Sequence, residues 1–470
     1  MTNPIGSRRI QRVACAALLD FLAILFAASQ VVAAAAKERP NIVLIISDDQ
    51  HWGDYGFMGH PHVRTPHLDR LATQSLVFPR GYVPSSLCCP SLASIITGRY
   101  PHQHKITSND PPNPESLPAG KFYQSQAFRD GREVMNRFMD AQPTLPRLLV
   151  QHSYLALQTG KWWQGDYRHG GFTHGMTQGG RHGDDGLDIG RKTMQPIYDF
   201  IAEARKERKP FFVWYAPMMP HQPHDPPPRL LDHYKDKAAA LPVAKYWAMI
   251  EWFDETCGQL LDHLEQQNLA TNTIVAFLAD NGWITDPATG RYAPKSKQSP
   301  YDGGLRTPIL LRWPGKAAPT RSPHLASSLD LLPTLVAATG LPQMADLPGA
   351  NLLDSTAVAK RTTLFGECFT HSAVDLTKPA ANLRWRWMIE SDWKLLVPWP
   401  ANEPTAAVEL YKLANDPNEE TNLTSVKAEQ VSAMRTKLDA WWNPEAGASA
   451  VTNLTTSALT TPTPRPASPR

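Results

Sequence analysis

Four short segments of the chain are almost continuously apolar, and each leads within a few residues into polar side chains. They are residues 41–46 (NIVLII), 154–157 (YLAL), 211–215 (FFVWY) and 273–278 (TIVAFL). Strands of this composition are typically buried on both faces, as in a parallel sheet that helices cover. The pattern therefore predicts four central strands of one such sheet.

Helical periodicity fills the intervals between these segments. Residues 67–74 follow Thr65 and Pro66, a capping residue and a first-turn proline, and residues 193–206 and 245–267 repeat apolar positions every three or four residues. Alternating strands and helices predict an α/β fold with a large, mostly parallel sheet flanked by helices. Ligands of such sheets bind at the carboxyl ends of the strands. There the polar residues after the four strands would meet: Asp48, Asp49, Lys161, His221, Asp280 and Asn281.

The C-terminal part of the chain has a different pattern of apolar and polar residues. After a predicted helix at 329–335, short strand-like segments separated by polar turns precede a helix at 427–442; they are residues 362–365, 385–390, 393–397 and 408–413. We expect a large domain over residues 37–345 and a smaller antiparallel α+β subdomain over 346–443. Residues 444–470 are rich in Thr, Ala, Ser and Pro, which predicts a disordered tail.

The N-terminus is typical of an export signal. Arg8, Arg9 and Arg12 precede an apolar run over residues 13–28, and small residues follow at 31–36. An uncleaved membrane anchor is the alternative, but the run is short for a span and Asp20 interrupts it. We therefore expect residues 1–36 to be a signal peptide, no stable membrane span, and a periplasmic or extracellular protein.

Composition adds two constraints. A formal net charge of +3 with arginines at both ends gives no reason to expect a nucleic-acid partner. Besides Cys15 in the signal, the chain has only Cys88, Cys89, Cys257 and Cys368, too few for a disulfide framework. Adjacent cysteines bridge each other only with strain, so the Cys88–Cys89 pair is a candidate for chemistry.

Two pairs of oxygen ligands suggest a metal site. Asp48–Asp49 and Asp280–Asn281 each follow a predicted buried strand, and such side chains suit Ca²⁺ or Mg²⁺ rather than zinc, which draws on histidine or thiolate. Acidic doublets in loops are often solvated turns or caps. Two pairs that each end a buried strand favour the metal.

A second set of residues suits an anion. Lys161, His221 and Lys297 around a metal would neutralise developing negative charge and protonate a leaving group. Pro90 and Gly98 bound a predicted helix that begins at the two cysteines, where the helix dipole lowers a thiol pKa and free N–H groups attract anions. Two small buried apolar residues would explain the same pair, and the residues alone leave both interpretations open.

A series of motifs occurs in one order along the chain. They are NIVLIISDDQ (41–50), TPHLDRLA (65–72), CCPSLASIITGRYPHQH (88–104), TGKWW (159–163), APMMPH (216–221), AFLADNG (276–282), KQSPYDGGLRTPILLRWPG (297–315) and ELYKLANDPNEETNL (409–423). In this combination the chain resembles the type I sulfatases of the alkaline phosphatase-like superfamily over roughly residues 38–425. In that family a cysteine of a Cys-x-Pro-x-Arg motif is converted to formylglycine, and Cys88 stands in that place.

The resemblance implies a role for each candidate residue. Asp48, Asp49, Asp280 and Asn281 would hold Ca²⁺, or less expectedly Mg²⁺, together with the modified Cys88. The aldehyde hydrate at position 88 would attack sulfur and later expel sulfate. Lys161 and Lys297 would bind the sulfate group, and His221 would protonate the leaving alcohol. The implied partners are a sulfated glycan or other sulfate ester and a formylglycine-generating maturation enzyme.

Two positions depart from the family pattern. Leu92 replaces the motif arginine, which supports the formylglycine and helps the maturation enzyme recognise the cysteine. Trp163 replaces a histidine that helps deprotonate the hydrate and release sulfate. The main hypothesis is a Ca²⁺-dependent sulfatase acting on sulfated carbohydrates. The alternatives are a phosphodiesterase or phosphonate monoester hydrolase of the same superfamily and a non-catalytic, glycan-binding relative.

Overall fold

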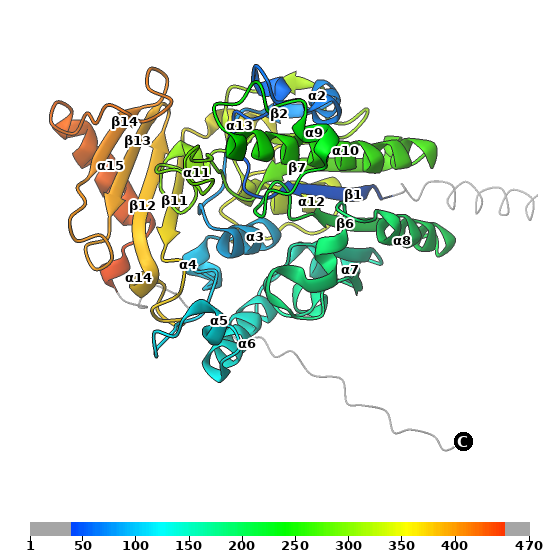
Figure 1. Ribbon diagram of the computed structural model, residues 1–470, viewed down its shortest axis with the longest axis horizontal. Coiled ribbons are helices and arrows are strands. Elements are labelled where there is room, and N and C mark those ends of the chain that lie inside the picture. Colours follow the sequence, from blue (N-terminus) through cyan, green and yellow to red (C-terminus); the bar gives the residue numbers. More distant parts are fainter. Residues whose placement is uncertain (1–38, 447–470) are drawn as a thin grey trace, which may run out of the picture. The chain divides into compact units, whose positions relative to one another are not determined.

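The large sheet has eight strands in the order β5-β4-β6-β1-β7-β8-β2-β9 (Figure 1). The structure is a computed structural model that describes residues 39–446, and all elements below belong to the unit that begins at Asn41. The strands are β1 (Asn41–Ser47), β2 (Leu76–Phe78), β4 (Leu155–Gly160), β5 (His174–Gly175), β6 (Phe211–Ala216), β7 (Thr273–Ala279), β8 (Ile309–Arg312) and β9 (Thr320–Arg321). All neighbours are parallel except β8, which is antiparallel to β7 and β2. The predicted mostly parallel sheet is confirmed.

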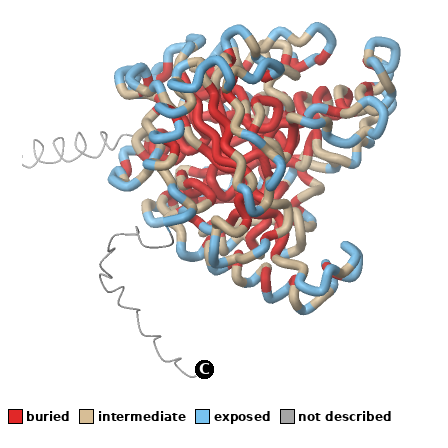
Figure 2. Tube along the Cα trace, turned by 90° about the vertical axis from the view of Figure 1, so that its left-hand side faces the viewer, coloured by how far each residue is buried: buried red, intermediate tan, exposed pale blue. Residues whose placement is uncertain are grey.

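Both faces of the central strands are covered, as their apolar composition requires. In β1, Ile42, Leu44 and Ile46 join one apolar cluster, whereas Val43 and Ile45 join a second. The first cluster includes residues of α3 (Cys88–Thr97), α7 (Leu145–Val150) and α12 (Leu331–Ala338), and the second includes residues of α2 (Pro66–Thr73), α8 (Gln195–Lys206) and α10 (Leu241–Gln266). Figure 2 shows this buried interior in red.

The smaller sheet is antiparallel, in the order β11-β12-β13-β14. Its strands, drawn in orange in Figure 1, are β11 (Thr363–Phe369), β12 (Leu383–Glu390), β13 (Trp393–Pro398) and β14 (Glu409–Lys412). Helix α15 (Ala428–Trp441) packs on it through Met434 and Leu438. The predicted α+β arrangement is confirmed, whereas the boundaries at 345 and 346 stay a prediction.

Several element ends differ from the sequence prediction, and two of them have a clear local reason. Strand β4 continues to Gly160, three residues beyond the apolar segment, because backbone pairing with β6 extends as far as Gly160 and Ala216. Helix α10 begins at Leu241 rather than at residue 245, with Pro242 in the first turn, where its missing N–H costs no helical hydrogen bond.

Both predicted terminal segments fall largely outside the described residues. The predicted signal peptide, residues 1–36, lies outside them entirely. Of the predicted tail, Pro444–Ala446 form a short 3₁₀ turn and the rest is not described. Within residues 39–446, no helix combines the length and apolar character needed to cross a membrane.

Candidate active site

The predicted polar residues converge at the carboxyl ends of the central strands. Asp48 and Asp49 follow β1, Lys161 follows β4, and the pair Asp280 and Asn281 follows β7. The backbone N–H of Asp49 donates to Oδ1 of Asp280, 3.1 Å away, which joins the ends of β1 and β7 directly. The convergence expected of this edge of the sheet is confirmed.

Two buried lysines neutralise the carboxylates. Nζ of Lys161 lies 2.7 Å from Oδ1 of Asp48 and 3.8 Å from Oδ2 of Asp280. Nζ of Lys297 lies 2.7 Å from Oδ2 of Asp49, and Nε2 of His221 lies 3.5 Å from the same oxygen. The anion-binding set and the acidic set predicted separately from the sequence therefore form one pocket.

Three oxygen atoms in this pocket fit a cation. Oδ2 of Asp48, Oδ2 of Asp280 and Oδ1 of Asn281 are buried, and none has a hydrogen-bond partner among the described residues. Buried polar atoms are nearly always satisfied, so such a cluster calls for a ligand. Oxygen atoms of Asp48, Asp49 and Asp280 also lie within 4.8 Å of one another. An all-oxygen set of this kind suits a hard divalent cation such as Ca²⁺ or Mg²⁺.

Burial and the neighbouring charges shift the pKa values of the three carboxyl groups in different directions. Burial raises the pKa of Asp48 and that of Asp280, although Lys161 opposes the shift at both residues. At Asp49 burial acts in the same sense, but Lys297 and His221 outweigh it and hold the pKa below its usual range. A divalent cation adds positive charge that favours the ionised form of all three groups.

Cys88 is the first residue of α3 and faces this pocket, with Sγ 3.9 Å from Oδ1 of Asp49. The expectation that the helix dipole would lower its pKa is wrong, because burial raises the pKa of the thiol to about 12. Cys89 instead packs inward, and its Sγ accepts a hydrogen bond from Nε2 of Gln164 at 3.0 Å. Both cysteines are buried in one apolar cluster, but only Cys88 also faces the carboxylates, so the chemical role predicted for Cys88 stays a prediction. Within the described chain all four cysteines are free.

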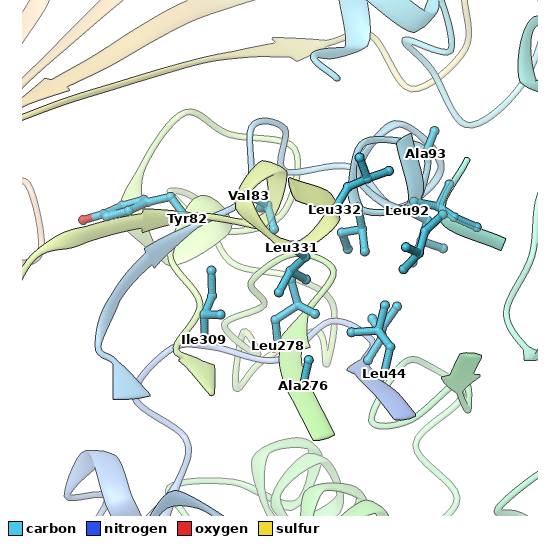
Figure 3. Packing of buried hydrophobic residues seen from close by; sticks show 14 of the residues in the cluster. Leu44, Tyr82, Val83, Leu92, Ala93, Ala276, Leu278, Ile309, Leu331 and Leu332 are labelled. Atoms are coloured by element: carbon cyan, nitrogen blue, oxygen red, sulfur yellow. The ribbon is translucent and has the colours of Figure 1, made fainter. Parts of the chain in front are cut away.

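The two departures from the family pattern are both buried. Leu92 is 2% exposed and packs in the apolar cluster that contains Leu44 and Leu332 (Figure 3). Trp163 is equally buried, and Nζ of Lys161 lies 5.9 Å from its ring centroid. Trp162 joins the same apolar cluster, in agreement with a packing role for the tryptophan pair.

Five further charged or ionisable residues lie within or just after the motifs, and each contacts a residue that does not belong to the pocket. Arg99 pairs with Asp346, His102 with Glu367, Arg168 with Asp166 and His169 with Asp140, while His104 contacts Ser94.

Sequence reasoning missed His182. Its ring contacts Trp163 edge-on, at 4.4 Å between ring centroids, and lies 5.9 Å from the ring of His221. The glycines around His182 indicated only a loop, and no spacing linked that loop to Lys161.

Comparisons with known proteins agree with this arrangement. The Sulfatase family profile matches residues 40–341, and the profile of the N-sulphoglucosamine sulphohydrolase C-terminal region matches residues 290–442. Human N-acetylgalactosamine-6-sulfatase is 29% identical over 68% of this chain and 66% of its own length. Human arylsulfatase A is 30% identical over 83% of this chain and 84% of its own length.

A solved structure extends the likeness to the whole fold. It is that of BT4656 in complex with its substrate, D-glucosamine-2-N,6-O-disulfate, and it aligns with a TM-score of 0.69 and 19% identity over 87% of this chain and 99% of that one. Fold and site together define a hydrolase of the alkaline phosphatase-like superfamily. Within it the chain belongs to the sulfatase family and is a sulfuric ester hydrolase.

Proposed function

We propose that this enzyme removes sulfate from sulfated carbohydrates by means of a formylglycine made from Cys88. The observation that carries the proposal is the position of Cys88, whose Sγ lies 3.9 Å from Asp49 at the centre of the carboxylate and lysine pocket. The substrates named for the relatives, an N-acetylgalactosamine 6-sulfate group and a disulfated glucosamine, support carbohydrate sulfates as the substrate class.

The three buried oxygens without a hydrogen-bond partner among the described residues support a divalent cation in this site, and Ca²⁺ is the proposed ion. Asp48, Asp49, Asp280 and Asn281 would hold it, together with the modified side chain at position 88. When bound, such a cation polarises the oxygen atoms that it contacts. The protein's own cations then hold the substrate: Lys161 and Lys297 each have ammonium hydrogens beyond those donated to Asp48 and Asp49, and these donate to the sulfate oxygens.

The proposed reaction starts from the hydrated aldehyde at position 88, whose carbon carries two hydroxyl groups. One hydroxyl gives its proton to the carboxylate of Asp49, which lies beside position 88, its oxygen bonds to sulfur, and the bond from sulfur to the ester oxygen breaks. The leaving oxygen takes a proton and departs as an alcohol. The second hydroxyl then gives its proton to His221, which is neutral after protonating the leaving oxygen; the hydroxyl oxygen forms the aldehyde C=O bond, and the carbon–oxygen bond to sulfate breaks. Asp49 releases its proton to solvent. Water then hydrates the aldehyde again.

His221 is the proposed proton donor to the leaving oxygen. Its Nδ1 lies 2.6 Å from the carbonyl oxygen of Gln222 and donates to it, so Nε2 faces Asp49 and the pocket. Burial and the nearby Lys161 lower the pKa of His221 to about 3. A bound sulfate anion acts in the opposite direction and favours the imidazolium form that can donate.

Maturation must precede folding. Cys88 and the neighbouring motif residues Pro90 and Leu92 are all buried, so a second enzyme cannot reach the thiol in the folded protein. We therefore propose that the maturation enzyme acts on the unfolded chain.

The test is mass spectrometry of the peptide that spans residues 81–99, from protein made in a host with working maturation machinery. Formylglycine at position 88 and turnover of a sulfated sugar are expected. Cys88→Ala should abolish turnover, whereas the matched variant Cys89→Ala should retain it. An unmodified Cys88 would contradict the formylglycine mechanism, and glycan binding that is the same in wild type and Cys88→Ala, without turnover, would contradict catalysis.

A parallel assay separates sulfate from phosphate chemistry. The same preparation should hydrolyse sulfate esters faster than phosphate diesters or phosphonate monoesters. A clear preference for the phosphorus substrates would replace the proposal by the phosphodiesterase hypothesis.

A further inference from the structure

The loop over residues 180–188 is fixed against the end of β4. The backbone N–H of Trp162 donates to the carbonyl oxygen of His182 at 3.0 Å. Gly183 has φ of +126°, and a Cβ there would lie 2.4 Å from the carbonyl oxygen of Gly160. Only glycine permits that approach, so this contact holds His182 beside Lys161.

The backbone of His182 is itself strained, with φ of 72° and ψ of −17°. This left-handed region is uncommon for residues other than glycine. Asp184 maintains it, because its carboxylate accepts hydrogen bonds from the N–H groups of Gly180 at 2.6 Å and Gln178 at 3.1 Å. Strain of this kind persists where the surrounding structure enforces it, and it is frequent at functional sites.

The side chain of His182 is directed to the pocket. Its ring stands at 84° to Trp163 with 4.4 Å between centroids, and its centroid is 5.9 Å from that of His221. Burial and the charge of Lys161 lower the pKa of His182, so the ring is neutral. An imidazole thus contacts the tryptophan that replaces the family's histidine, with the two rings nearly perpendicular.

Arg181 decides which ring nitrogen carries the proton. Its Nη1 lies 2.9 Å from Nε2 of His182, and a guanidinium can only donate, so Nε2 accepts and Nδ1 bears the hydrogen. Arg181 is fixed in turn by Asp110, with Nε 3.0 Å from Oδ1 and Nη2 2.9 Å from Oδ2. Arg181 also stacks on Trp163 and Tyr123, at 4.9 and 4.6 Å from the ring centroids. Nδ1 has no hydrogen-bond partner within residues 39–446.

We propose that His182 is a further catalytic residue, which donates its Nδ1–H to an oxygen atom of the substrate's sulfate group. Arg181 and Asp110 are its positioning residues. The inference rests on the proposed function. Because Nε2 accepts from Arg181, His182 can donate a hydrogen bond but cannot act as a base. It therefore takes the place of the family histidine as a polar group beside the sulfate, but it does not deprotonate the hydrate.

The test compares His182→Ala with His182→Asn. The Asn amide nitrogen occupies the place of Nδ1, and Asn tolerates the left-handed backbone. Affinity for inorganic sulfate is measured by calorimetry and kcat/KM on a sulfated sugar by steady-state kinetics. The Ala variant should lose about 100-fold in both, as when one donor to a developing oxyanion is removed, and the Asn variant should remain within about tenfold of wild type. His169→Ala, at a partly exposed histidine paired with Asp140, is the control and should behave as wild type.

The positioning role has a spectroscopic readout. Imidazole ¹⁵N shifts should show His182 as the Nδ1–H tautomer in wild type and as a mixture in Arg181→Ala.

Sulfate binding requires no turnover, so the two proposals fail separately. A wild-type protein that binds sulfate but hydrolyses no sulfate ester would contradict the proposed function and still report on His182. Unchanged sulfate affinity in His182→Ala, or equal losses in the Ala and Asn variants, would overturn the role of His182.

Discussion

Nζ of Lys297 lies 2.7 Å from Oδ2 of Asp49, and both side chains are buried. The two residues are far apart in the chain, and this contact joins the loop after β7 to the end of β1. The ammonium group of Lys297 can attract an anionic substrate, and in the absence of substrate it neutralises the carboxylate of Asp49.

Replacement of Lys297 should therefore affect function and stability together. Lys297→Met removes a proposed donor to the sulfate group, and we expect kcat/KM to fall by about 100- to 1,000-fold. Leaving Asp49 buried without this partner should cost about 3–5 kcal/mol of unfolding free energy in chelator-treated protein. Steady-state kinetics and urea unfolding measure the two effects. Lys316→Met, at an exposed position, should change neither.

Calcium should stabilise the folded protein through the pocket carboxylates. A ligand that binds only the folded state at 100 times its Kd adds about 2.7 kcal/mol, so Ca²⁺ should raise Tm and a chelator should reverse the rise. Asp280→Asn removes one buried carboxylate and should reduce this calcium-dependent shift, whereas Asp236→Asn, at an exposed position, should preserve it. An identical shift in wild type and Asp280→Asn would place the ion elsewhere.

Restoring the family's arginine at position 92 should harm the protein. Leu92 packs with Leu44 and Leu332, and an unpaired guanidinium in that cluster would cost several kcal/mol or force the helix to move. Leu92→Met keeps the volume and should cost less than about 1.5 kcal/mol. Thermal unfolding of both variants is the measurement. An Arg variant as stable as wild type would show that an acidic partner is within reach.

The small sheet is tied to the large domain by one buried lysine. Nζ of Lys394 in β13 lies 2.7 Å from Asp302 of α11 (Asp302–Leu305) and 2.8 Å from Glu419, and all three side chains are buried. Lys394→Met removes the cation that Asp302 and Glu419 share and leaves the buried Glu419 without an ion-pair partner among the described residues, so it should destabilise the protein by about 3–5 kcal/mol in urea. The control is Lys412→Met, which breaks a partly exposed pair with Asp392 and should cost less than about 1 kcal/mol.

His104 should make stability depend on pH. Burial lowers its pKa to about 3; its Nδ1 accepts from the N–H of Ile106, so Nε2 donates to Ser94. Below the ordinary histidine pKa the unfolded chain binds a proton that the folded chain does not, so this stability is complete above about pH 6.5 and decreases as the pH falls. Between about pH 6.5 and pH 4.5 the loss should be on the order of 2 kcal/mol.

Unfolding free energies of His104→Gln should be less sensitive to this pH change. His62→Gln, at an exposed position, should follow wild type, and equal pH dependence in all three proteins would exclude His104 as the cause.

The sequence by itself determined the central strands β1, β4, β6 and β7, several of the helices and the candidate residues other than His182. Runs such as 41–46 are apolar at every position because both faces of a central strand are buried, and the polar residues behind them must then meet at one edge of the sheet. The ordered motifs identified the family. These signals come from residues that are close together in the sequence, so they can be read without the tertiary structure.

The motif had pointed to Cys88, but only the tertiary structure showed how the two cysteine side chains are directed and where a second imidazole comes from. Cys88 and Cys89 are chemically identical, and the turn of α3 alone sends one toward Asp49 and the other toward Gln164. His182 reaches the site because its irregular loop contacts Gly160 and Trp162. No periodic pattern in the sequence predicts these contacts. The high pKa of Cys88 likewise arises from burial, which depends on every element packed around it.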